Sequence, residues 1–345
     1  MRVGRGVKIA AAGGPVRHIP VLLAEALEAL NVRADGVYLD GTFGAGGYSS
    51  ALVERGARVV AVDRDPAAVA AGQRLVAASR GRLTLVEGRF GELDAIARRL
   101  GAAPLDGVVL DVGVSSMQFD EASRGFSLRH DAPLDMRMEG TGRSAADILR
   151  DEDERTIADI LFHFGEERAA RRIARAIVAD RKTSPYVSTL QLAEMIARVA
   201  PARPGETTHP ATRAFQALRI AVNDELGQLL GALEAAERAL GPGGRLVAVT
   251  FHSLEDRIVK QFLARRAGRG EAASRRLPGE PAPALPTFLA PAGQPILPDS
   301  AELAANPRAR SAKLRFGERT ATPALAKDAE IAALTRLPPA RPGRG

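Results

Sequence analysis

The chain has 345 residues, of which 46% are hydrophobic and 26% are charged, and its formal net charge is +7. This composition is ordinary for a folded globular protein and excludes a disordered chain. There is no cysteine, which excludes disulfides, thiolate-bound zinc, iron–sulfur clusters and every mechanism with a cysteine nucleophile.

The excess positive charge lies at the two ends of the chain. Residues 1–17 carry a net charge of +4 and residues 319–345 a net charge of +3, so residues 18–318 are neutral. One internal stretch, from Arg257 to Arg276, holds seven basic residues and one acid. It is either a solvated helix face or a strip that contacts phosphates.

No feature of the sequence indicates a membrane or an export route. No apolar run approaches the roughly 20 residues of a membrane span. The first 17 residues are basic but lack the apolar core of a secretory signal. We therefore expect a cytoplasmic protein without membrane contact.

Short apolar strands alternate with helices over the first third of the chain. The strands are rich in Val and Leu and apolar on both faces, which is typical of a buried parallel sheet with helical crossovers. The expected elements are a helix over 21–30, a strand at 36–40, a helix from about Gly47, a strand at 58–63, a helix after Pro66, a strand at 82–88, a helix near 92–100 and a strand at 106–111.

The alternation stops after Asp111 and returns near residue 215. Between them we expect only helices and polar loops, with a capping box at Ser144. The expected later elements are helices at 166–181 and 189–199, one long helix from 215 to 233 ended by the glycines of 241–244, a strand at 245–250, a helix at 254–266, a Pro-rich loop at 277–300 and a last strand at 313–319. This order predicts one α/β domain interrupted by a helical insertion, with ragged tails. The predicted parts are an α/β domain of 18–119 and 220–318, an all-helical insertion of 120–219, and tails of 1–17 and 319–345.

The most specific local pattern runs from Val37 to Gly47, where a strand ends in Asp40 and a glycine-rich turn opens a helix. Glycines allow positive φ and close backbone approach to a ligand, and the helix start offers free N–H groups. The next strand ends at Asp63, where a carboxylate is placed to accept hydrogen bonds from both ribose hydroxyls of an adenosine-containing ligand. Asp65 is its rival, and the alternation along the strand favours Asp63. The pattern leaves a dinucleotide and S-adenosylmethionine both open, although the glycine spacing is not GxGxxG.

Two further strand ends complete the predicted pocket, because ligands of open α/β sheets lie outside the carboxyl ends of the strands. Phe90 follows the third strand, and its ring either flanks adenine or belongs to the core. Asp111 ends the fourth strand, and Gln118 lies seven residues further on.

With these residues in view, the sequence resembles the bacterial 16S ribosomal RNA cytosine-N4 methyltransferases, which modify cytidine 1402 of the decoding site with S-adenosylmethionine. The matching blocks span about 18–318, nearly the whole chain. They are HIPVLL (18–23), DGTFGAGG (40–47), AVDRDP (61–66), DVGVSS-Q (111–118), RGFSLRHDAPLDMRM (124–138), GEERAARRIARAIV (165–178), HPATRAFQALRIAVNDEL (209–226), FHSLEDRIVK (251–260) and NPRARSAKLR (306–315).

The resemblance implies a doubly wound, mostly parallel sheet of the class I methyltransferase, Rossmann-like kind, with an inserted all-helical domain that recognises the substrate. It implies S-adenosylmethionine as cofactor, no metal, and 16S rRNA within the small ribosomal subunit as partner, and it leaves monomer and homodimer open. The cofactor-binding residues that it implies are Gly46, Gly47, Tyr48, Asp63, Phe90, Asp111 and Gln118. The family usually has His at Tyr48, which is harmless if that contact is through the backbone and alters cofactor affinity if it is through the imidazole.

The chemistry of an exocyclic amine points to one further residue. The amine lone pair is conjugated into the ring, so the enzyme must orient the amine and remove a proton. His252, after the strand at 245–250, is the candidate catalytic residue, since its imidazole is able to take that proton; the alternative is a helix cap at Ser253. Asp111 is near enough to accept from the amine, but the resemblance assigns it to the cofactor. Methylation at cytosine C5 generally uses a cysteine adduct, so the absence of cysteine agrees with a nitrogen target.

RNA contact is expected from the insertion and the loops that face the cleft. The candidate substrate-binding residues are Arg124 and Arg137, in the loop after the fourth strand, and Arg257. A folded rRNA site is recognised by shape and splayed bases, and a stacked cytidine has to be flipped out. Two alternatives remain: a methyltransferase that acts on another amine, and a ribosome-assembly RNA-binding factor with a vestigial cofactor site.

Overall fold

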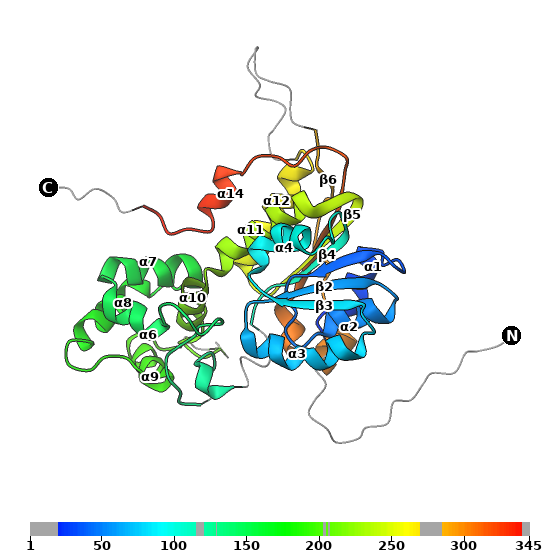
Figure 1. Ribbon diagram of the computed structural model, residues 1–345. Coiled ribbons are helices and arrows are strands. Elements are labelled where there is room, and N and C mark those ends of the chain that lie inside the picture. Colours follow the sequence, from blue (N-terminus) through cyan, green and yellow to red (C-terminus); the bar gives the residue numbers. More distant parts are fainter. Residues whose placement is uncertain are drawn as a thin grey trace, which may run out of the picture.

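A seven-stranded sheet forms the centre of the computed structural model, in the order β3-β2-β1-β4-β5-β7-β6 (Figure 1). The structure describes residues 20–114, 121–128, 130–202, 205, 208–269 and 285–339. The strands are β1 (Val37–Asp40), β2 (Arg58–Asp63), β3 (Leu83–Glu87), β4 (Leu105–Asp111), β5 (Leu240–Thr250), β6 (Phe288–Leu289) and β7 (Lys313–Arg319). The first five pair in parallel, whereas β7 is antiparallel to β5 and β6 to β7. This confirms the doubly wound, mostly parallel α/β sheet.

Helices cover both faces of the sheet. Because successive side chains of a strand point to opposite sides, each strand contributes to two hydrophobic cores. In β2, Val59 and Ala61 belong to one buried cluster and Val60 and Val62 to the other. Helices α1 (Leu23–Leu30), α2 (Gly47–Glu54) and α3 (Pro66–Ala78) pack on the first face, and α4 (Leu93–Arg99), α11 (Glu225–Ala239) and α12 (Ser253–Arg266) pack on the second.

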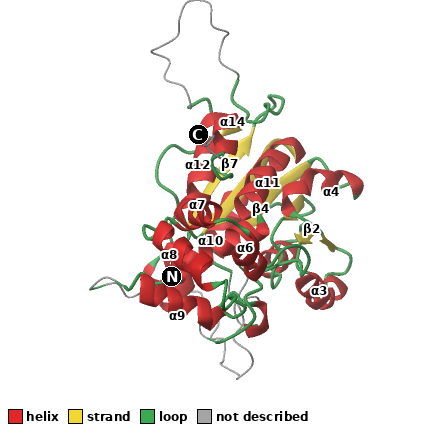
Figure 2. Ribbon diagram, turned by 90° about the vertical axis from the view of Figure 1, so that its left-hand side faces the viewer, coloured by secondary structure: helices red, strands yellow, loops and turns green. Residues whose placement is uncertain are grey.

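Between β4 and α11 the chain forms a helical lobe beside the sheet (Figures 1 and 2). Its helices are α6 (Ala145–Asp151), α7 (Glu154–Gly165), α8 (Ala170–Asp180), α9 (Thr189–Val199) and α10 (Thr212–Asn223). Ser144 caps α6 together with Asp147 in the predicted capping box. The core of the lobe is continuous with the core beneath α11 and α12, so the lobe is firmly attached to the sheet.

The bounds of two predicted helices were wrong, because the apolar spacing continues through a point where one helix ends and the next begins. The long helix of 215–233 is two helices, since Asp224 has a left-handed backbone (φ 48°) between α10 and α11. The helix predicted at 166–181 begins only at Ala170, because Glu166 (φ 50°) ends α7. In both places the residues on either side of the break face the same core.

The C-terminal segment and the start of β5 also differ from the prediction. Residues 319–345 were expected to form a tail, but α14 (Ala329–Ala333) packs against α11 and α12 through the fully buried Ile331. Strand β5 begins at Leu240 rather than at 245. The smaller elements are the 3-10 helices η1 (Phe90–Glu92), η2 (Ala122–Arg124) and η4 (Pro307–Ser311) and the helix α13 (Ser300–Ala305). The predicted basic tail of 1–17 lies outside the described residues. Within the described part of the chain, we find no helix with the length and apolarity needed to span a bilayer.

Candidate active site

A cavity of about 700 Å³ lies at the carboxyl ends of β1, β2 and β4, between the sheet and the helical lobe. Its volume is that of a site for a small-molecule ligand. The sheet side supplies six predicted site residues, which are Gly47, Tyr48, Asp63, Phe90, Asp111 and His252. The lobe side supplies apolar side chains, among them Met136, Met138 and Phe215. Gln118 lies outside the described residues.

The glycine turn is shaped by close contacts that a side chain would block. Gly46 has φ 79°, and a Cβ there would lie 2.8 Å from the ring of Phe43. A Cβ on Gly47 would lie 2.1 Å from Cγ of Pro20. Glycine at these positions therefore lets the chain before α1 close onto the start of α2, where backbone N–H groups are unpaired within the helix.

Asp63 is the acid that faces the cavity, as predicted. Its two carboxylate oxygens accept hydrogen bonds from the backbone N–H groups of Gly44 (2.7 Å) and Asp65 (2.8 Å). Burial raises the pKa of Asp63 above its ordinary value. The rival Asp65 caps α3 through the N–H of Ala67 (3.0 Å) and forms an ion pair with Arg124 (3.0 Å), so its carboxylate is already committed.

The hydroxyl of Tyr48 forms its hydrogen bond within the protein. Its side chain is buried in α2, and its hydroxyl donates a hydrogen bond to the carbonyl of Val21. Burial raises the pKa of Tyr48, so the hydroxyl stays protonated. Tyr48 is therefore left with its ring face and its backbone for contact with a ligand, and its polar end holds the segment before α1.

Two buried acids end neighbouring strands at this edge of the sheet, and one of them, Asp111, lines the floor of the cavity. Asp111 Oδ1 has no hydrogen-bond partner among the described residues, and burial, with the nearby charges of Asp40 and Glu255, raises the pKa of Asp111 to about 8. Burial likewise raises the pKa of Asp40 to about 6, although Ser49 (2.7 Å) and the N–H of Thr42 (3.1 Å) donate to it. Such a floor favours a cationic ligand, which would compensate the carboxylates. Asp40 ends β1 as Asp63 ends β2, but it does not line the cavity and acts on the site only through its charge beneath Asp111.

His252 is the N-cap of α12, so the capping alternative is realised one residue earlier than expected. The backbone N–H of Glu255 points to Nδ1 of His252 over 3.4 Å, and Oε1 of Glu255 lies 2.9 Å from Nε2. Oε1 of Glu255 and Nε2 of His252 are not aligned as a hydrogen bond, and neither atom has another partner in the described part of the chain. Ser253 instead donates to Glu166 (2.9 Å).

Glu255 is fully buried behind His252. Burial alone would raise the pKa of Glu255, but His252 and Arg219 outweigh it and hold that pKa below its usual value. Glu225, His252 and Glu255 bring their polar atoms within 4.8 Å of one another, a grouping able to hold a metal. However, both carboxylate oxygens of Glu225 accept from the guanidinium of Arg219 (2.7 and 2.8 Å). We therefore interpret the cluster as a proton-carrying network.

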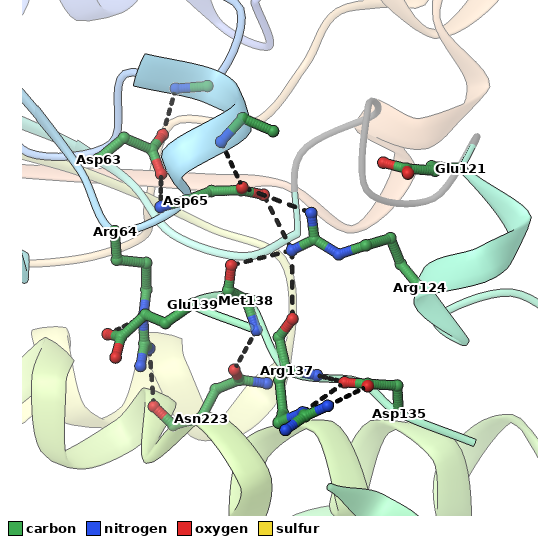
Figure 3. Close-up of polar contacts among 12 residues, drawn as sticks. Asp63, Arg64, Asp65, Glu121, Arg124, Asp135, Arg137, Met138, Glu139 and Asn223 are labelled. Carbon is green, nitrogen blue, oxygen red and sulfur yellow. Dashed lines mark hydrogen bonds and ion pairs between the residues drawn. The ribbon is translucent and has the colours of Figure 1, made fainter. Parts of the chain in front are cut away.

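The three arginines predicted to bind RNA have different surroundings, two of which Figure 3 shows. Arg124 donates to the carbonyls of Arg137 (3.1 Å) and Met138 (2.9 Å) in addition to its ion pair with Asp65. Arg137 binds Asp135 through Nε (2.9 Å) and Nη2 (2.6 Å). Arg257 lies 3.3 Å from Glu166 and keeps about half of its side chain exposed. Arg124 and Arg137 thus build the loop, and Arg257 remains accessible.

Comparison with known proteins identifies the family. The model of the MraW methylase family matches residues 15–320. The chain belongs to this family. It is 63% identical over 340 residues to the ribosomal RNA small subunit methyltransferase H of Methylocella silvestris, with 98% of each chain covered. It is 60% identical to the protein of the same name from Beijerinckia indica, with 98% of this chain and 96% of that protein covered.

Likeness to solved structures is more distant. A putative rRNA-methylase from Clostridium thermocellum is 13% identical, with a TM-score of 0.41 and coverage of 88% of this chain and all of that one. A putative methyltransferase from Streptococcus mutans is 10% identical, with a TM-score of 0.39 and coverage of 88% and 99%.

As a member of the MraW methylase family, the chain is an S-adenosylmethionine-dependent methyltransferase. The cavity fits this cofactor on its own chemistry. Gly44 and Gly47 of the glycine turn line it, Asp63 offers carboxylate acceptors, and the Asp111 oxygen that has no partner among the described residues suits a cationic group.

Proposed function

We propose that this methyltransferase transfers a methyl group to N4 of cytidine 1402 in the decoding region of 16S rRNA. The observation that carries the proposal is the identity of about 60% with small-subunit rRNA methyltransferases over nearly the whole chain. A nitrogen target is supported by His252, which lines the cavity with the buried carboxylate of Glu255 beside it, and by the absence of a cysteine able to attack the ring.

In this proposal the sheet side of the cavity holds the cofactor. Asp63 accepts from the ribose, Phe90 flanks the adenine, and Asp111 compensates the positive charge. The backbone of Gly47 and Tyr48 forms the close wall, whereas Gly46 does not line the cavity and, like Gln118 outside the described residues, is assigned by the resemblance. When bound, the cofactor supplies the methyl group from its sulfonium.

The lobe side of the cavity receives the cytidine. Met136, Met138 and Phe215 line it and offer an apolar surface for a flipped base. His252 is the proposed proton acceptor for the amine, and the Glu255 carboxylate behind it stabilises the imidazolium that forms. Arg257 is the proposed phosphate contact, whereas Arg124 and Arg137 act by holding the loop that carries the two methionines. The partner is 16S rRNA within the small ribosomal subunit.

The test is mass spectrometry of the decoding-site fragment of 16S rRNA from a strain that lacks this gene. We expect the N4-methyl mark to disappear and to return when the wild-type chain is supplied. Persistence of the mark in the deletion strain would refute the assigned target. A mark that disappears from another nucleotide would keep the chemistry but move the site.

A further inference from the structure

Glu139 lies at the end of the loop that leads into the helical lobe, and one carboxylate there serves two arginines. Oε1 accepts from Nε of Arg64 (2.8 Å) and from Nε of Arg89 (2.8 Å), and Oε2 accepts from Nη2 of Arg89 (2.8 Å). Figure 3 shows the Arg64 side of this contact. The two arginines are 75 and 50 residues away in the sequence, so the lobe clamps two distant turns of the sheet.

Each arginine is the neighbour of a residue proposed to bind the cofactor. Arg64 directly follows Asp63 at the end of β2, and Arg89 directly precedes Phe90 after β3. Both Asp63 and Phe90 line the cavity. A single carboxylate from the lobe therefore contacts the residue next to the ribose acceptor and the residue next to the adenine-flanking ring.

The same loop forms the opposite wall of the cavity. The N–H of Met138 donates to Oδ1 of Asn223 (2.9 Å), and Nδ2 of Asn223 donates to the carbonyl of Met136 (2.7 Å). Arg64 completes the ring of contacts through the carbonyl of Asn223 (2.8 Å). Met136 has φ 64°, a left-handed backbone that a non-glycine residue keeps only where its surroundings hold it.

The ion pairs of Glu139 with Arg64 and Arg89, called the Glu139 clamp below, are stronger together than an ordinary surface ion pair. Exposed ion pairs contribute little, but bidentate and shared pairs are the exceptions. The Arg64 side chain is 11% exposed and that of Glu139 is 20% exposed. Without the Glu139 charge, the nearby charge of Asp224 would offset only part of the repulsion between Arg64 and Arg89, which belong to the two turns.

We propose that Glu139 is a positioning residue that couples cofactor binding to the docking of the lobe loop of residues 130–139. The proposal rests on the assignment of Asp63 and Phe90 to the cofactor. Because coupling between two sites is reciprocal, a ligand that orders the Asp63 and Phe90 turns also orders this loop, and a loosened loop weakens the ligand. The loop that lines the substrate side of the cavity is then fully ordered only when a ligand occupies the cofactor side.

The first test is calorimetry of the full chain with S-adenosylhomocysteine. We expect Glu139→Gln to weaken binding about fivefold or more, which is the lower range of measured couplings between sites. Arg89→Gln should weaken it in the same direction, and the double variant should lose less than the two single losses combined. The matched control is Glu152→Gln, which removes another ion pair of the lobe (2.7 Å to Arg143) away from the cavity and should leave the affinity unchanged.

The second test is hydrogen exchange of residues 130–139 with and without S-adenosylhomocysteine. Ligand should slow exchange in the wild type and in Glu152→Gln but not in Glu139→Gln, a difference that general destabilisation does not produce. Equal affinity and equal protection in wild type and Glu139→Gln would overturn the coupling, whereas a wild type that binds no ligand would instead overturn the cofactor assignment. Should Glu139→Gln not fold, Arg89→Gln, whose side chain is half exposed, carries the same two measurements.

Discussion

Glu255 approaches both nitrogens of the His252 imidazole, with its backbone N–H at 3.4 Å from Nδ1 and its carboxylate at 2.9 Å from Nε2. His252 is therefore a helix cap and half of a buried acid–base pair at the same time. The two roles make different demands on the side chain, because a cap needs only an acceptor and a proton acceptor needs a titrating group.

The substitution His252→Asn separates these roles. Asn is a good N-cap residue, so the melting temperature should stay within about 2 °C of wild type, which is less than 1 kcal/mol in a chain of this size. The loss of the titrating group should lower kcat about 100-fold or more, measured as methyl transfer to small ribosomal subunits from a deletion strain. His252→Ala, as the control, should lose both properties. Full activity in the Asn variant would leave capping as the role of His252.

Asp63→Asn tests the ribose assignment. The amide keeps the size of the side chain but removes the charge, and a hydrogen bond to a charged group contributes about 1.5–3 kcal/mol. Affinity for S-adenosylhomocysteine, measured by calorimetry, should therefore fall about 10- to 100-fold. Asp35→Asn is the matched control, since Asp35 is exposed and pairs with Arg82 at the surface. Unchanged affinity in Asp63→Asn would mean that Asp63 only holds the glycine turn through the N–H of Gly44.

The pKa of Asp111, raised to about 8 by burial and by neighbouring acids, predicts proton release on cofactor binding. A cationic ligand favours the ionised carboxylate, so affinity for S-adenosylmethionine should rise with pH up to about 8 and then level off. Calorimetry at pH 7 in two buffers of different ionisation enthalpy measures the released proton. The release should be absent in Asp111→Asn, and an equal release in that variant would assign the proton to another group.

The raised pKa of Asp111 also predicts how the stability of the ligand-free protein depends on pH. Folding favours the protonated form of Asp111, so its stabilising contribution is complete below the unfolded pKa of about 3.9 and is lost as pH rises through about 8. Asp111→Asn should therefore melt with the wild type at pH 4. At pH 8.5 it should melt at a clearly higher temperature than the wild type, because the whole contribution of the Asp111 carboxyl group has been lost by then. A variant that melts lower at pH 8.5 would contradict the raised pKa.

Sequence patterns predicted the sheet better than the contacts around it. The bounds of β2 and β7 agree with the prediction to the residue, and for β2 the reason is that a strand buried on both faces is a compact apolar run. Asp63 and Asp111 were placed correctly because a strand end fixes which residue faces a ligand site. The break at Asp224 was invisible, since the apolar spacing runs through it. The Glu139 clamp joins residues 50 and 75 positions apart, and no local pattern carries such a pairing.

The C-terminal segment, predicted to be a ragged tail, gives the last test. Arg266 and Glu237 form a buried ion pair (2.9 Å, with side chains 4% and 1% exposed). The segment completes it, because the carbonyl of Ala326 accepts from Arg266 (2.9 Å) and the N–H of Leu325 donates to Glu237 (3.3 Å). Deletion of residues 320–345 should lower the melting temperature by about 4 °C or more, since each unsatisfied buried group costs about 1–3 kcal/mol.

Deletion of residues 340–345 alone is the control for this truncation and should leave the melting temperature unchanged. Residues 320–339 do not line the cavity, so both truncated chains should bind S-adenosylhomocysteine with wild-type affinity at temperatures well below their melting points. Equal melting temperatures for the two truncations would show that the packing of Ile331 and the completion of the buried pair contribute nothing to stability. A loss of affinity in the longer truncation would instead connect α14 to the cavity through α11 and α12, the helices against which it packs.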